Sequence, residues 1–286
     1  MSDEVTVASQ REWETILASL AREKRMIFFA GLPGVGKSLF IRELAHAAHA
    51  GGRRVHLLQW DVARPAFVTP AIAVRYPERG GETHAMIRLA VGEWSRGTVR
   101  RWRREHDASH ILIGEVPLIG HRLLDLVQAQ ADDAEPLLAG PDVLFAIPVP
   151  SIAVRDTIEN ARSRTFANPA HVRERADAPP DLLRMAWREL HGHAVALGAA
   201  QVVEGDAPYD PHAYAAVFRH LLRHRQTLTL WMNTKLAPVR SVYDLDISAI
   251  ELVPQAGEAE AIVARLEKKY SPAEIECDAA RWFEKV

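Results

Sequence analysis

The chain of 286 residues contains one cysteine, Cys277, so an internal disulfide is impossible. It has no apolar run near the roughly 20 residues that a membrane-spanning helix needs. Residues 2 to 4 are Ser, Asp and Glu, which is not the basic start of a signal peptide. Lysine is scarce, with six residues against 29 arginines, and the formal net charge is only −2. A disulfide-stapled, a membrane-spanning or a generally basic nucleic-acid-binding protein is therefore not expected, and we expect a cytoplasmic protein.

Short apolar runs alternate with amphipathic segments along most of the chain. The runs expected to form strands are 26–30, 55–60, 110–114, 143–147, 201–203 and 227–232. Apolar residues at helical spacing predict helices at 9–24, after the glycine-rich loop that follows residue 30, around 87–102, and at 151–164, 181–197 and 211–225. This alternation indicates a mostly parallel sheet of five or six strands with helices on both faces, an α/β fold with three layers.

The pattern becomes looser after residue 232. It offers only the short strand candidates Val242–Leu245 and Ile250–Val253 and a charged helix at 257–270. We therefore expect residues 1–232 to form the core, including an N-terminal helix and a helical lid at about 151–180. Residues 233–286 are expected to form a C-terminal α/β appendage.

The most specific motif is Gly31-Leu-Pro-Gly34-Val-Gly36-Lys37-Ser38, which fits G-x-x-x-x-G-K-[ST] at every position. Gly31 and Gly36 allow the backbone to curl, so that its N–H groups can bind phosphate oxygens. The helix that follows directs its positive end at the same anion. Lys37 supplies a charge for the β and γ phosphates, and the Ser38 hydroxyl can bind Mg²⁺.

This segment resembles the Walker A motif of the P-loop NTPases. The resemblance implies a P-loop α/β/α fold and ATP and Mg²⁺ as ligands. The residues that it assigns to nucleotide binding are Gly31, Gly34, Val35, Gly36, Lys37, Ser38 and Leu39.

Two motifs of other P-loop classes are missing. A GTPase would ordinarily carry N-K-x-D, but the nearest candidate, Asn233-Thr234-Lys235-Leu236, has the wrong order. Many P-loop ATPases end a strand with adjacent Asp and Glu, whereas here Glu115 stands alone before Val-Pro. The remaining layout is most similar to the P-loop kinases of nucleosides and small metabolites.

In such kinases an acid after the second strand accepts the proton of the attacking hydroxyl. The resemblance implies this catalytic role for Asp61 and a substrate-binding role for Asp61 and Arg64. A strand-end aspartate that caps a turn, beside a surface arginine, is the alternative. Glu115, at the end of the third strand, can hold Mg²⁺ through water together with Ser38 or assist the base, and an ordinary strand-end acid is again the alternative.

Arginines follow the fourth strand, where such kinases carry a lid. Arg155 and Arg162 are seven residues apart and share a helix face. The resemblance implies that Arg155 binds substrate and that Arg162, with Lys37, stabilises the transferring phosphoryl group. Because the chain is rich in arginine, a surface role for both is the alternative.

The leading hypothesis is therefore an ATP- and Mg²⁺-dependent kinase that acts on a hydroxyl group of a small, nucleoside-like or sugar-like acceptor. A nucleotide-dependent ATPase or switch with a protein partner, docked through the region after 233, is a second hypothesis. A kinase of polynucleotide ends that uses the basic run Arg100–Arg104 is a third. The run is more simply a solvated helix end with Trp102 on the apolar face, so neither nucleic acid nor membrane is an expected partner.

Overall fold

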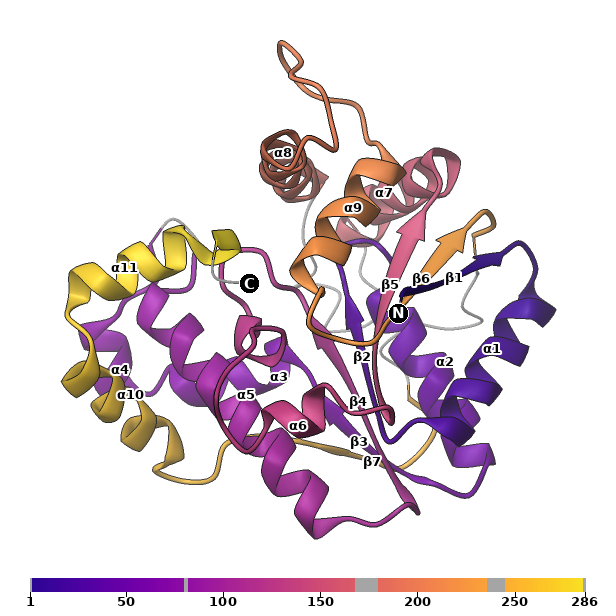
Figure 1. The fold of residues 1–286 in the computed structure, drawn as a ribbon. Helices are drawn as coiled ribbons and strands as arrows, with labels where there is room; N and C mark the ends of the chain where they lie inside the picture. Colours follow the sequence, from indigo (N-terminus) through magenta and orange to yellow (C-terminus); the bar gives the residue numbers. More distant parts are fainter. Residues whose placement is uncertain (1, 80–81, 168–179, 236–244, 285–286) are drawn as a thin grey trace.

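The computed structural model describes residues 2–79, 82–167, 180–235 and 245–284. A parallel sheet runs through its centre in the order β1-β6-β5-β2-β4-β3-β7 (Figure 1). Its strands are β1 (Ser2–Val7), β2 (Met26–Ala30), β3 (Arg54–Leu58), β4 (His110–Val116), β5 (Val143–Pro150), β6 (Thr227–Met232) and β7 (Ala249–Glu251). The expected α/β fold with a parallel sheet is confirmed.

Helices cover both faces of the sheet (Figure 1). They are α1 (Gln10–Glu23), α2 (Lys37–Ala50), α3 (Trp60–Ala63), α4 (Pro70–Arg75), α5 (Ala85–Glu105), α6 (Glu135–Leu138), α7 (Ile152–Ala167), α8 (Pro180–Ala196), α9 (Pro211–Leu221), α10 (Glu258–Lys269) and α11 (Pro272–Ala280). In β2, Ile27 and Phe29 pack with the helices α1 and α2, whereas Met26 and Phe28 pack with α5 and α9. A strand buried on both faces has to be apolar throughout, which explains the uninterrupted run at 26–30.

The direction of the chain reverses at β2. From β2 the chain moves to β3, returns to β4 directly beside β2, and then crosses to β5 on the other side. In open α/β sheets, ligands bind at the carboxyl ends of the strands where such a reversal occurs. The glycine-rich loop leaves β2 at this point.

The sheet is wider than expected because a strand is added at each edge. β1 pairs with β6 and carries the exposed acids Asp3 and Glu4, and β7 pairs three residues with β3. The strand predicted at 201–203 is wrong: these residues form no strand, and Val202 is 81 % exposed. Residues 242–244 of the other candidate lie outside the described part.

The C-terminal elements contact the rest of the fold. Besides the pairing of β7 with β3, α10 packs on α5, where Glu258 accepts hydrogen bonds from Trp94 Nε1 at 3.2 Å and from Arg101 at 3.1 Å. The division into a core and an appendage at residue 232 concerns folding units and stays a prediction.

Buried arginines tie the segment after β4 to its neighbours. Arg96 on α5 binds Asp132 at 2.7 Å and Glu135 at 2.7 Å, and Arg225 binds Glu135 at 2.7 Å from the other side. Burial alone would raise the pKa of Glu135, but the hydrogen bonds from Arg225 and Arg96 outweigh it and lower the pKa to about 2. Part of the arginine content is thus structural.

Two glycines of α5 give a matched test of this packing. A Cβ at Gly92 would lie 2.0 Å from the buried Oδ2 and 2.9 Å from Cγ of Asp125, whereas a Cβ at Gly97 meets nothing within 4 Å. We expect Gly92→Ala to lower the free energy of unfolding by about 1–3 kcal/mol. Gly97→Ala is expected to raise it by roughly 0.5–1 kcal/mol, because alanine is the better helix former. Urea denaturation measures both, and equal effects at the two positions would contradict the close contact at Gly92.

Candidate functional site

The glycine-rich loop has the strand–loop–helix setting that its motif requires. It leaves the buried strand β2 and enters α2, whose N-cap Gly36 has a φ of 93° and makes no side-chain capping hydrogen bond. Gly34 also adopts a positive φ, of 79°, which residues with a Cβ rarely adopt. The first amides of α2 thus have no side-chain cap, as an anion-binding helix terminus requires.

Lys37 lies within this loop. Its side chain is largely buried, and its Nζ donates to the carbonyl oxygens of Gly31 at 2.9 Å and Leu32 at 2.8 Å. The loop therefore wraps around the ammonium group. Ser38 follows as the second residue of α2 and is half-buried.

Helices α8 and α9 cover one side of the loop. The hydroxyl of Tyr214 on α9 accepts a hydrogen bond from the Leu32 amide at 3.3 Å, and it would lie 2.4 Å from a Cβ at Gly31. Leu183 on α8 would lie 3.1 Å from a Cβ at Gly34. Neither glycine can be replaced without moving these neighbours.

Glu115 lies beside the phosphate loop. β4 pairs directly with β2, with Glu115 opposite Phe29, so the acid reaches the neighbourhood of Lys37. Burial, with a further contribution from Asp61, raises the pKa of Glu115 to about 7, although Lys37 acts in the opposite direction. A buried carboxyl facing a lysine and a second carboxyl is a candidate for holding a cation or a proton.

Asp61 lies in the first turn of α3, directly after β3, and is exposed. Since β3, β4 and β2 are neighbours, Asp61, Glu115 and Lys37 gather at the carboxyl edge of three adjacent strands. Arg64, one turn after Asp61, forms an ion pair with Glu78 at 2.5 Å. Its predicted substrate contact stays a prediction.

Arg122 is a residue of this neighbourhood that pattern analysis missed. Its guanidinium lies 6.0 Å from the Trp60 ring and close enough to Asp61 to interact with its charge. Burial and the neighbouring Arg88 lower the pKa of Arg122, and Asp61 raises it. Its Nε atom is buried and has no hydrogen-bond partner among the described residues.

A strained turn holds Arg122 in place. Leu118, His121 and Leu123 all have positive φ values, of 65°, 68° and 58°. Each costs of order 1–3 kcal/mol, and such strain concentrates at functional sites. The Leu118 amide donates to the Arg122 carbonyl at 3.0 Å, and the Arg122 amide donates to the Leu118 carbonyl at 3.2 Å. Arg88 donates to the Gly120 carbonyl at 2.9 Å. The sequence signal for this turn is its position after the strand that carries Glu115.

Of the predicted lid at about 151–180, the structure describes α7 and the first residue of α8. Arg155 on α7 is 2 % exposed, bonds Glu159 at 2.7 Å, and lies 5.4 Å from the Tyr209 ring. Arg162 also lies on α7, but its side chain is outside the described part, as are residues 168–179. The roles given to Arg155 and Arg162 stay predictions.

The basic run Arg100–Arg104 lies at the end of α5. Trp102 is 2 % exposed and stacks on His106 with 5.3 Å between ring centroids, so it is not placed to stack on a nucleic-acid base. Each arginine of the run forms an ion pair with an acid. The pairs are Arg100–Asp133, Arg101–Glu258, Arg103–Asp142 and Arg104–Glu105. This arrangement does not favour the third hypothesis.

Within the described residues, no helix combines the length and the apolar character needed to cross a bilayer. No protein-family model matches the sequence, and no curated protein matches it. Among solved structures, Kti12 of Chaetomium thermophilum in complex with ADP-AlF₃ matches 86 % of this chain and 99 % of that chain, at 10 % identity and a TM-score of 0.24. A similarity this low supports no conclusion about the chain.

Proposed function

We propose that this protein is an ATP- and Mg²⁺-dependent phosphotransferase that acts on a hydroxyl group of a small molecule of nucleoside or sugar type. The observation that carries the proposal is the gathering of Lys37, Glu115 and Asp61 at the carboxyl edge of β2, β4 and β3. A phosphate cradle, a metal-binding acid and a base for the acceptor are the parts that phosphoryl transfer needs.

The loop suits the polyphosphate of ATP. Gly34 and Gly36 give it the left-handed turns that aim amides inward, and α2 begins there without a side-chain cap. Lys37 would exchange its contacts with the loop carbonyls for phosphate oxygens. Ser38 and Glu115 supply a hydroxyl and a carboxylate, which are oxygen donors of the kind that Mg²⁺ prefers. Bound there, Mg²⁺ would neutralise charge on the phosphates.

In the transfer step, Asp61 would act as the general base. Its carboxylate would accept the proton of the acceptor hydroxyl as the oxygen bonds to the γ-phosphorus and the bond to the β-phosphate oxygen breaks, releasing ADP. Lys37 would stabilise the charge on the leaving oxygens. Arg122, across from Asp61, offers a guanidinium for an anionic or hydroxyl-rich part of the acceptor.

Acceptor-dependent ADP formation tests the proposal. We expect ADP release with Mg·ATP to rise when one class of small hydroxyl compounds is added, with one phosphorylated product per ADP. Mass spectrometry identifies that product. Steady ATP turnover that no small molecule changes would contradict a kinase, and failure to bind Mg·ATP in calorimetry would remove the nucleotide from the proposal.

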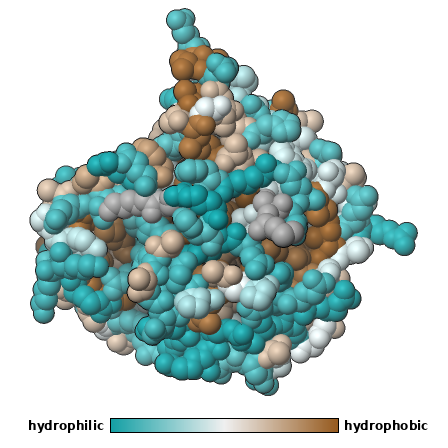
Figure 2. Space-filling view, in the orientation of Figure 1, coloured by the Kyte–Doolittle hydropathy of each residue, from teal (hydrophilic) through white to brown (hydrophobic). Residues whose placement is uncertain are grey.

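A second candidate is a nucleotide-dependent switch that binds a protein. Exposed apolar side chains gather on α8 and on the segment that follows it, namely Leu182, Met185, Leu197, Val202 and Val203. Figure 2 shows brown side chains at the top of the view, where Figure 1 places these elements. Because α8 also contacts the phosphate loop, a partner there would sense the nucleotide. Slow ATP turnover that only a protein fraction accelerates is the result that favours this candidate.

A further inference from the structure

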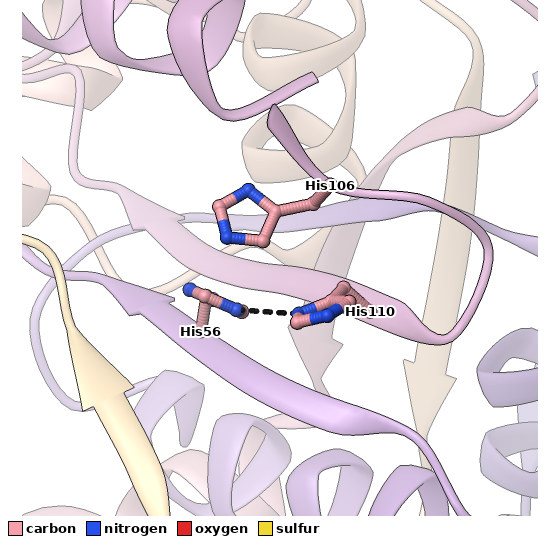
Figure 3. Close-up of side chains that lie close together, drawn as sticks. All are labelled: His56, His106 and His110. Atoms are coloured by element: carbon pink, nitrogen blue, oxygen red, sulfur yellow. Dashed lines mark hydrogen bonds between the residues drawn. The ribbon is translucent and has the colours of Figure 1, made fainter. Parts of the chain in front are cut away.

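Three histidines meet at the end of the sheet opposite the phosphate loop (Figure 3). His56 lies within β3, His110 begins β4, and His106 follows the last turn of α5. One ring nitrogen of each lies within 4.8 Å of the other two. We call these three residues the histidine cluster. The nucleotide site leaves them without a role, because the loop lies at the other end of β2.

Hydrogen bonds fix the state of the His106 ring. Its Nδ1 lies 2.9 Å from the carbonyl oxygen of Trp102. Because a carbonyl only accepts, Nδ1 carries a proton, and in the neutral ring Nε2 is then the nitrogen with the lone pair. A histidine that binds a metal through one ring nitrogen usually donates the N–H of the other nitrogen to an acceptor such as a backbone carbonyl, which orients the ring. Stacking on Trp102 further limits the rotation of the ring.

The other two rings share one hydrogen bond. His56 Nε2 lies 2.9 Å from His110 Nδ1, and Figure 3 shows a ring nitrogen of His106 turned towards this pair. His56 is only 2 % exposed, and its Nδ1 has no hydrogen-bond partner among the described residues. The cluster therefore contains a buried ring nitrogen that has no hydrogen-bond partner among the described residues, which is unusual for a buried polar atom.

The spacing fits a tetrahedral ion. With Zn–N bonds of about 2.0–2.1 Å, two ligand nitrogens stand roughly 3.4 Å apart. The nitrogens of the cluster, at 2.9 Å for one pair and within 4.8 Å for all, bracket that separation.

The donor atoms select the kind of ion. His110 feels the positive charges of Arg54 and Arg25 as well as the negative charge of Asp107. The cluster offers nitrogen ligands and no carboxylate of its own, so Ca²⁺ and Mg²⁺, which bind oxygen, are disfavoured. Imidazole nitrogens suit Zn²⁺, Ni²⁺ and Cu²⁺.

We propose that the histidine cluster is a binding site for a transition-metal ion of the Zn²⁺ type, held by one ring nitrogen of each histidine with water in the remaining position. The ion would join the end of α5 to β3 and β4. Its role would be to stabilise this edge of the sheet, independently of the nucleotide.

Calorimetry on the untagged chain of 286 residues, stripped with a chelator and titrated with ZnCl₂, tests the site. We expect one ion per chain and no displacement by millimolar Mg²⁺. Co²⁺ in place of Zn²⁺ should give the visible absorption of a tetrahedral nitrogen-bound ion. Saturating Zn²⁺ should raise the melting temperature, because the three histidines come together only in the folded state.

Substitutions of single histidines test whether Zn²⁺ binds at the cluster or at another histidine of the chain. His106→Ala and His110→Ala should each lower the Zn²⁺ affinity at least about 100-fold and remove the thermal shift. His49→Ala, at an exposed position in the last turn of α2, should change neither. His110→Asn provides a second variant if alanine prevents folding, as judged by circular dichroism. Absence of saturable Zn²⁺ uptake by folded wild-type protein, or unchanged affinity in the folded variants, would show that the rings only pack against Trp102.

Discussion

Lys37→Ala is expected to weaken Mg·ATP binding at least about tenfold and to lower the rate of phosphoryl transfer about 10³-fold or more. The reason is that Lys37 is the cation enclosed by the loop, with its Nζ held by the Gly31 and Leu32 carbonyls. Without the ammonium group, only the loop amides would stabilise the negative charge that develops on the phosphate oxygens. Calorimetry with Mg·ATP and the acceptor-dependent ADP assay measure the two effects.

An exposed lysine provides the control for this substitution. Lys235→Ala removes one positive charge from a solvent-facing side chain and should leave both measurements unchanged. Because Lys37 is buried, circular dichroism must first show that Lys37→Ala is folded. Wild-type ATP affinity in folded Lys37→Ala would exclude the phosphate contacts assigned to this residue.

Asp61→Asn is expected to reduce transfer about 10²–10⁴-fold, the usual contribution of a general base, while Mg·ATP affinity stays within about twofold of wild type. The asparagine keeps the shape of the side chain but cannot accept the hydroxyl proton. Asp61 lies on α3 and not on the phosphate loop, so its substitution should not disturb the loop. Single-turnover transfer and calorimetry separate chemistry from binding.

Asp133→Asn is the matched control, because Asp133 is an exposed aspartate whose side chain is 87 % exposed. It should behave as wild type in both assays. If Asp61→Asn transfers phosphate at the wild-type rate, Asp61 is not the base, and Glu115 becomes the carboxyl to test. A fall in ATP affinity as large as the fall in rate would instead assign Asp61 to nucleotide or metal binding.

The centre of the sheet could be predicted from the sequence because strands buried on both faces have to be apolar. The runs at 26–30 and 143–147 fall within β2 and β5. The edge strand β1 could not be predicted in the same way, since its acids Asp3 and Glu4 are exposed and Val7 is its one buried residue among those described. The other edge strand, β7, overlaps the predicted candidate Ile250–Val253 at Ile250 and Glu251. The apolar residues at 201–203 also led to the wrong prediction of a strand, because the two valines there lie exposed in a loop.

The candidate site was predictable where a motif fixes the backbone and unpredictable where tertiary contacts do. The phosphate loop follows from glycine and lysine spacing alone. Arg122 could not be found because its position depends on three left-handed residues that are not glycine, which no local propensity favours. The histidine cluster joins residues up to 54 positions apart, so its spacing matches no metal-binding motif.

The two outer strands have a consequence for self-association. A strand with free N–H and C=O groups invites another chain to pair with it. On one side of this sheet the outermost strand carries Asp3 and Glu4, whose charges would repel a copy of themselves. On the other side only Ala249–Glu251 is available, which is too short for stable pairing. A dimer built by extending the sheet is therefore disfavoured, and contacts between copies would have to form through the helices.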